Sequence, residues 1–170
     1  MEKVELNKDM KLSEHLASPS EAALSHSSKL DGLRLSPHFS LGEMTKTNYV
    51  TKDGNIPSRV VIENLTNLCE NWLEELRFRA NQPIVINSGY RSAEVNRMCG
   101  GATNSNHLTG GAVDIRCKDK KQAIRYGCIL LDIADGKKMD FDELFLERRG
   151  TTIWVHFAVK PRGNRCHVEF

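Results

Sequence analysis

The sequence predicts an α+β domain in which a small antiparallel sheet packs against helices. Three observations support this prediction. An amphipathic helix follows Ser58, a second amphipathic helix lies over residues 118–135, and several short β-rich segments flank the second helix. Helices and short antiparallel strands segregate along the chain, which is typical of the α+β class.

The size and composition of the chain set the domain organisation. The 170 residues suffice for one compact domain, and hydrophobic residues at 39% with charged residues at 27% are normal for a globular core. Residues 1–31 are polar and rich in Ser, Lys and Glu, so we expect a partly ordered N-terminal extension there. Residues 32–170 are expected to form the folded domain.

The first half of this domain is predicted to be helical. Residues 35–47 form an entry segment and a helical turn that Ser40 can cap. After a loop over residues 51–58, Ser58 can cap a longer helix. Its apolar residues recur at helical spacing on one face, which is more typical of a core than of a site. These residues are Val61, Leu65, Leu68, Trp72 and Leu76.

The second half alternates short elements and loops. Residues 83–92 are β-rich, residues 92–101 form a short helix capped by Ser92, residues 102–111 form a polar loop, and residues 112–115 form a strand. An amphipathic helix over residues 118–135 carries Ile124, Cys128 and Leu131 on one face. Residues 141–159 form a β-hairpin with its turn near Arg149-Gly150, and residues 166–170 could add an edge strand.

Composition also limits the classes of partner. The net charge of +2 and the small basic clusters give no reason to expect nucleic-acid binding. No apolar stretch approaches the roughly 20 residues of a membrane helix, and the N-terminus has no apolar segment typical of a secretory signal, so we expect synthesis in the cytoplasm. Five cysteines without a CxxC spacing predict structural thiols. We expect a monomer.

Three residues are candidates for a metal site: His107, Asp114 and His156. Asp114 lies in the apolar run Ala-Val-Asp-Ile, where an unpaired charge is costly. A Gly-Gly pair between His107 and Asp114 lets the loop turn back. Two histidines and a carboxylate are a common ligand set for catalytic zinc. A strand histidine can equally be a core residue, and Asp114 could bond a backbone turn, so the positions alone leave both interpretations open.

The surrounding sequence resembles the M15 zinc peptidases, which include the D-Ala-D-Ala carboxypeptidases of peptidoglycan. Their Ser-x-His-x-x-Gly-x-Ala-x-Asp motif lies within "SGYRSAEVNRMCGGATNSNHLTGGAVDI". Its residues here are Ser105, His107, Gly110, Ala112 and Asp114. A Tyr-Arg-Ser segment at residues 90–92 precedes the motif, and a Trp-Val-His segment at residues 154–156 follows it. The likeness spans roughly residues 34–159 and implies the fold shared by hedgehog domains and these peptidases.

The resemblance implies a Zn²⁺ cofactor held by His107, Asp114 and His156, and attack of zinc-activated water on an amide carbonyl. Arg91 matches the family arginine that faces the substrate and stabilises an oxyanion or a substrate carboxylate. Tyr90 is assigned to substrate binding by the same segment. Ser105 is expected to hydrogen-bond the substrate or to orient the loop.

The general base departs from the family pattern. Many members of the wider family carry Glu three residues before the last histidine, where this chain has Ile153. With the hairpin turn at Arg149-Gly150, Glu147 would pair with about Thr152 or Ile153, and the first register places it on the face of His156. This arrangement resembles the short, phage-like branch of the family. Glu147 is therefore the predicted base, and Glu143 is the reserve.

Two functions from different classes follow. The first is a zinc peptidase that cuts peptidoglycan peptides, acting in the cell wall or periplasm as a phage or prophage lysin, or in the cytoplasm in wall recycling. The second is a non-catalytic zinc module that binds a partner in a phage or cell-surface assembly. Arg91 and Glu147 favour the enzyme, and Ile153 favours the binding module. Asp142 is a further candidate to orient a ligand histidine.

Overall fold

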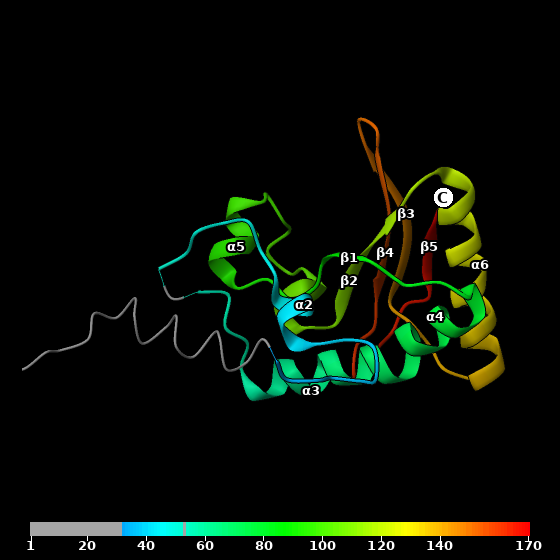
Figure 1. The fold of residues 1–170 in the computed structure, drawn as a ribbon, viewed down its shortest axis with the longest axis horizontal. Helices are drawn as coiled ribbons and strands as arrows, with labels where there is room; N and C mark the ends of the chain where they lie inside the picture. Colours follow the sequence, from blue (N-terminus) through cyan, green and yellow to red (C-terminus); the bar gives the residue numbers. More distant parts are fainter. Residues whose placement is uncertain (1–31, 53) are drawn as a thin grey trace, which may run out of the picture.

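The computed structural model describes residues 32–52 and 54–170, and the predicted extension over residues 1–31 lies outside them. Figure 1 shows the path of the chain. The helices are α2 (Leu41–Thr45), α3 (Arg59–Leu68), the π-helix η1 (Cys69–Leu73), α4 (Glu74–Ala80), α5 (Ala93–Met98), the 3-10 helix η2 (Asn106–Thr109) and α6 (Lys120–Lys137). The strands are β1 (Ile86–Ser88), β2 (Ala112–Cys117), β3 (Glu143–Arg149), β4 (Thr152–Ala158) and β5 (His167–Glu169).

The five strands form one sheet in the order β1-β2-β4-β3-β5, so the fold is of the predicted α+β class. β1 to β4 pair antiparallel, as predicted. The edge strand β5 pairs with β3 in parallel, so the prediction of a wholly antiparallel sheet is wrong at this edge. The reason is that the segment after β4 returns to the beginning of β3, where the N–H groups of Cys166 and His167 donate to the carbonyls of Phe141 and Asp142.

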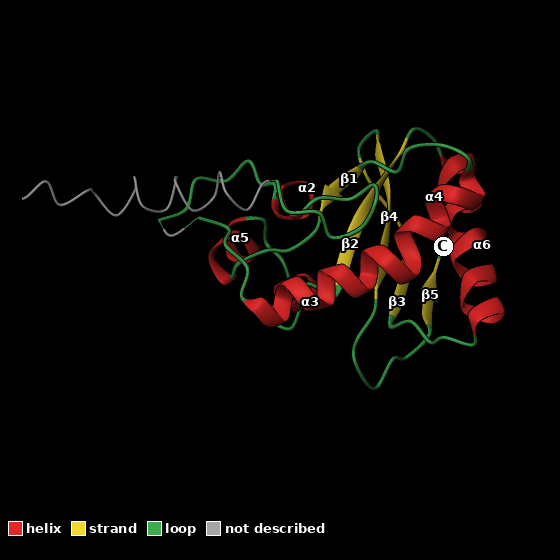
Figure 2. Cartoon of the chain, turned by 60° about the horizontal axis from the view of Figure 1, so that its bottom comes forward, coloured by secondary structure: helices red, strands yellow, loops and turns green. Residues whose placement is uncertain are grey.

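The predicted long helix is confirmed, with one irregular turn. Ser58 caps α3 by accepting a hydrogen bond from the N–H of Val61. The predicted apolar stripe is buried along its whole length, although the π-helix η1 interrupts it. Trp72 in η1 packs on Phe157 of β4, with 4.9 Å between ring centroids. Figure 2 shows α3, η1 and α4 as one continuous rod that crosses the strands.

Helix α6 is present, but its predicted face is wrong. Ile124 is 51% exposed and Cys128 is exposed, whereas the buried face is one residue out of phase. The buried residues are Ala123, Tyr126, Gly127, Leu130, Ile133 and Ala134. Besides Leu130 and Ile133, this face consists of small residues and a tyrosine, which carry little apolar signal in the sequence. Gly127 allows Phe170 and Leu146 to approach closely.

The two faces of the sheet differ in chemistry. One face carries apolar side chains that join the core with α3, η1, α4 and α6. On β2 and β4 these are Val113, Ile115, Val155 and Phe157. The alternate residues, Asp114 on β2 and His156 on β4, therefore lie on the opposite face. The period of two along the strands thus separates the core from a polar surface.

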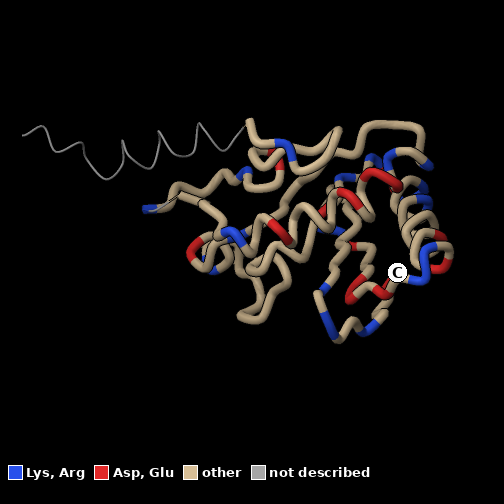
Figure 3. Tube along the Cα trace, turned by 90° about the horizontal axis from the view of Figure 1, so that it is seen from below, with Lys and Arg blue, Asp and Glu red and all other residues tan. Residues whose placement is uncertain are grey.

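Positively and negatively charged residues are mixed along the chain. Figure 3 shows Lys and Arg positions interspersed with Asp and Glu positions along the described chain. Among these residues, no helix combines the length and apolar character needed to cross a membrane. All five cysteines are free thiols. Cys69 and Cys117 are buried, as structural thiols would be, whereas Cys99 is half-buried and Cys128 and Cys166 are exposed.

Candidate metal centre

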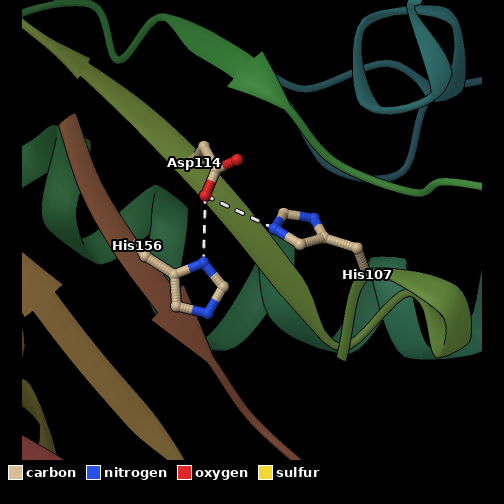
Figure 4. Close-up of side chains that lie close together, drawn as sticks. All are labelled: His107, Asp114 and His156. Atoms are coloured by element: carbon tan, nitrogen blue, oxygen red, sulfur yellow. Dashed lines mark hydrogen bonds and ion pairs between the residues drawn. The ribbon is translucent and has the colours of Figure 1, made fainter. Parts of the chain in front are cut away.

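His107, Asp114 and His156 converge from three elements, as Figure 4 shows. His107 is in the 3-10 helix η2, Asp114 is in β2, and His156 is directly opposite Asp114 in β4. Oδ1 of Asp114 lies 3.3 Å from Nε2 of His107 and 2.9 Å from Nδ1 of His156. The three side chains are the His/Cys/Asp/Glu group that could hold a metal ion among the described residues.

The loop between His107 and Asp114 folds back because of local chemistry. The hydroxyl of Ser105 accepts a hydrogen bond from the N–H of His107 and so begins η2. Gly110 ends this helix with φ of +73°, a left-handed conformation that favours glycine. A Cβ at this position would lie 2.7 Å from the carbonyl oxygen of Val61, so no larger residue fits without displacement.

Each of the three side chains has one atom occupied elsewhere, which leaves the other free for an ion. Nδ1 of His107 lies 2.6 Å from the carbonyl oxygen of Gly89. Nε2 of His156 lies 3.2 Å from Oε2 of Glu143, and Oδ2 of Asp114 accepts from Arg91 at 2.5 Å. The free atoms are therefore Nε2, Nδ1 and Oδ1, the three that face one another. Ligands in metal sites are oriented in this way.

The spacing of these atoms fits a small divalent ion. Tetrahedral ligands with bonds of about 2.0–2.1 Å are about 3.3 Å apart. The separation between Asp114 and His107 has this value, and that between Asp114 and His156 is slightly shorter. Two imidazoles and one carboxylate leave a fourth position open, as in catalytic zinc sites. The donor set thus fits the predicted zinc ion.

The charges around the site shift the pKa of Asp114 and of His156. Burial alone would raise the pKa of Asp114, but the two histidines that bond its carboxylate hold this pKa well below its ordinary value. Burial alone would lower the pKa of His156, but the carboxylates of Asp114 and Glu143 and the charge of Glu147 raise it. Asp114 therefore stays ionised, which is the form that binds a cation.

The centre lies in a hollow of about 770 Å³ between the β3–β4 hairpin and the loop before η2. Arg91 and Ser105 line this hollow, as their predicted roles require. The guanidinium of Arg91 is fixed by Ser88 at Nε and by Asp114 at Nη2. Tyr90 lies outside it, in a neighbouring hollow with Lys46 and Tyr49, so its substrate contact stays a prediction without geometric support.

Glu147 lines the same hollow, but in a different register from the two considered. It pairs with Trp154, since the turn comprises Gly150 and Thr151 and Arg149 pairs with Thr152. The parity is the same as for pairing with Thr152, so Glu147 lies on the face of Trp154 and His156. Its Oε2 accepts a hydrogen bond from Nε1 of Trp154 at 2.5 Å. Its role as base stays a prediction.

Glu143, and not Asp142, makes the contact to a ligand histidine. Glu143 contacts the ring of His156 and accepts from Asn106 at 2.9 Å, which occupies it as a support of the ligand. Asp142 is fully buried and bonds Arg165, Lys160 and Asn106, and its contacts include neither ligand histidine. Because its hydrogen bonds and ion pairs go to these three residues, the expectation that Asp142 orients a ligand histidine by direct contact is wrong.

Sequence reasoning did not identify Gly89, Asn106 and Arg165 as parts of this environment. Gly89 acts through its carbonyl, which no sequence pattern reveals. The sequence does indicate that such partners must exist. The adjacent carboxylates Asp142 and Glu143 stand at the beginning of an apolar strand and need cationic or hydrogen-bonding partners, which Asn106 and Arg165 supply. Their identity could not follow, because the partners come from distant elements, Asn106 from η2 and Arg165 from the segment before β5.

Comparison with known proteins gives one finding. No curated protein matches the chain. The sequence model of the family described as Peptidase M15 matches residues 37–139, which is more than half of the chain and includes His107 and Asp114. The chain therefore belongs to the peptidase M15 family.

Proposed function

We propose that this protein is a zinc-dependent peptidase that hydrolyses peptidoglycan peptides as a monomer, as a D-Ala-D-Ala carboxypeptidase or a related endopeptidase of the short, phage-like branch. One observation carries the proposal. Three free ligand atoms of His107, Asp114 and His156 face one another in a hollow whose wall also presents the carboxylate of Glu147. A ligand set with an open position beside an ionisable group is the arrangement of a hydrolase.

In the proposed reaction, each residue around the hollow has a separate role. A zinc ion, when bound, lowers the pKa of a coordinated water and polarises the scissile carbonyl. Glu147 takes the proton of the attacking water at a carboxylate oxygen and delivers it to the leaving nitrogen. The indole of Trp154 holds that carboxylate in place. Arg91 fixes Asp114 through Nη2, and its remaining N–H groups are available for a substrate oxygen.

The charges around the hollow favour an anionic peptide. The lining carboxylates of Asp114, Glu143 and Glu147 all have partners within the site. Arg148 and Arg149 also line the hollow, and neither forms an ion pair with a carboxylate among the described residues. Stem peptides of peptidoglycan carry free carboxylates, which these arginines can attract. Such peptides are available in the wall and in recycled fragments, and either is a compatible site of action.

The test is digestion of purified muropeptides by the zinc-loaded protein, with products identified by mass spectrometry. The proposal predicts hydrolysis that a chelator abolishes and added zinc restores. Loss of a terminal alanine would identify a carboxypeptidase, and internal cleavage an endopeptidase. His107→Ala should lose both bound zinc and cleavage. A wild-type protein with one zinc per chain and no cleavage of any muropeptide would overturn the proposal.

A non-catalytic zinc module is the second candidate. The observation that favours it is Ile153, which stands where many members of the wider family carry the base. In this case muropeptides would bind to the zinc-loaded protein and remain intact. The same digestion therefore separates the two functions, provided that binding is measured in parallel.

A further inference from the structure

The segment between β4 and β5 places the side chain of Arg165 beside the metal centre. This segment, residues 159–166, forms a loop at the end of the sheet (Figure 2). Asn164 closes it by bonding both the N–H and the carbonyl of Lys160, at 2.8 and 3.1 Å. The next residue, Arg165, lines the hollow that holds His107, Asp114 and His156. The loop is therefore built to a definite shape that ends in a guanidinium beside the site.

Arg165 joins two carboxylates with one guanidinium. Nε and Nη2 donate to the two oxygens of Asp142 at 2.8 and 2.7 Å. Nη2 also donates to Oε1 of Glu143. The side chain of Asp142 is fully buried, so it is a fixed anchor for a guanidinium that is itself about half exposed. A bidentate pair of this kind defines the position of the N–H group that reaches Glu143.

Glu143, which Arg165 holds in place, in turn contacts the ligand His156. Its other oxygen, Oε2, lies 3.2 Å from Nε2 of His156. An imidazole that donates from Nε2 presents the lone pair of Nδ1 to an ion, and Nδ1 is the atom that faces Asp114.

The same network reaches the loop of the other histidine. The amide of Asn106 donates to Asp142 at 2.8 Å and to Glu143 at 2.9 Å. Asn106 directly precedes His107 and is almost fully buried. The supports of both histidines therefore meet at the two carboxylates that Arg165 joins.

We propose that Arg165 is a positioning residue of the metal centre: acting through Glu143, it fixes the ring of His156 and thereby sets the affinity for zinc. This inference rests on the zinc centre of the proposed function. Its consequence is that residues 159–166, which lie beyond the part matched by the family model, belong to the working site.

The stability of the fold should depend on Arg165 less than the affinity for zinc does. Without the guanidinium, Asp142 keeps its ion pair with Lys160 at 2.8 Å and its hydrogen bond from Asn106. The loss should therefore fall on Glu143 and His156, and be visible in metal binding more than in stability.

The test is the affinity of the full chain for zinc, measured by competition with a chromophoric chelator. Arg165→Ala should weaken zinc binding about 10- to 100-fold, and Arg165→Lys should recover part of this loss. Arg162→Ala, an exposed change in the same loop, should bind like the wild type. The absorption of bound cobalt should change in Arg165→Ala and not in Arg162→Ala, which reports an altered ligand geometry.

A double variant tests the route through Glu143. Glu143→Gln should weaken zinc binding, and combining it with Arg165→Ala should add little, because both changes interrupt one contact chain. Should Arg165→Ala not fold, Arg165→Gln carries the test with a side chain of similar length. Zinc affinity of Arg165→Ala within twofold of the wild type, or fully additive losses, would overturn the inference. Either result leaves the peptidase proposal intact, and zinc binding without hydrolysis overturns only the latter.

Discussion

Trp154 and Glu147 are cross-strand partners in the β3–β4 hairpin, and the indole N–H of Trp154 donates to the carboxylate of Glu147. This bond holds an acidic group on the wall of the hollow without using it in metal binding. Glu147→Gln keeps the length and the hydrogen bond but removes the proton acceptor. We expect hydrolysis to fall by about 10²- to 10⁴-fold, with zinc content unchanged, in a steady-state assay paired with metal analysis.

The control for this change is Glu63→Gln on the exposed part of α3, which should leave hydrolysis at the wild-type rate. Retention of full activity by Glu147→Gln would remove Glu147 as the base. Glu143 would not simply replace it, because its carboxylate already bonds His156 and Arg165.

Gly110 and Gly100 form a matched pair for testing the loop of His107. Both have φ of +73°, but a Cβ at Gly110 would meet Val61 and Leu65, whereas a Cβ at Gly100 meets nothing within 4 Å. Gly100→Ala should cost about 1 kcal/mol of unfolding free energy from backbone strain alone. Gly110→Ala should cost about 1–3 kcal/mol more, since it also overpacks the core. Urea unfolding of both variants measures the difference, and equal losses would contradict this geometry.

Asp142 should make stability depend on pH. Hydrogen bonds from Arg165, Lys160 and Asn106 outweigh burial and hold its pKa below the ordinary value. A lowered pKa means that its contribution is present above the unfolded value of about pH 4 and is lost as pH falls through the folded value. Asp142→Asn should therefore cost about 1–3 kcal/mol near neutral pH and less in acid. Denaturant titrations of the metal-free wild type and variant, near neutral pH and in acid, test this. A loss of unfolding free energy that is independent of pH would refute it.

Arg149 should affect the choice of substrate more than the chemistry. It lines the hollow at the tip of the hairpin and has no carboxylate partner among the described residues. Arg149→Glu should raise KM for acidic muropeptides several-fold with little change in kcat, since a charge at the rim acts on association. The effect should shrink at high salt. An equal effect on a neutral peptide of the same length would show that charge is not the cause.

The sequence predicted correctly those features that depend on residues close to one another in the chain. Ser58 and Ser92 cap the helices expected of them, and the apolar stripe ending in Leu76 is buried. The spacing of His107 and Asp114 around a glycine pair, with a strand histidine later in the chain, pointed to the group that the structure brings together. Turn chemistry and strand period are local, so they can be derived without tertiary contacts.

Features that depend on distant packing could not be derived in this way. The parallel direction of β5 follows from hydrogen bonds of Cys166 and His167 to residues some 25 positions earlier. The buried face of α6 includes Gly127, which lies against Phe170 and Leu146 from distant parts of the chain. The register of Glu147 shifted by one or two positions from the expected pairing, because the turn lies one residue later than the Arg-Gly sequence suggested.

The central claim is that His107, Asp114 and His156 hold one zinc ion, and its most direct test is diffraction from zinc-loaded crystals on both sides of the zinc absorption edge. The account predicts one anomalous peak per chain, bound by Nε2 of His107, Oδ1 of Asp114 and Nδ1 of His156, with distances of about 2.0–2.2 Å. A peak held by other side chains, such as cysteine thiolates, or no peak between these three atoms would contradict it.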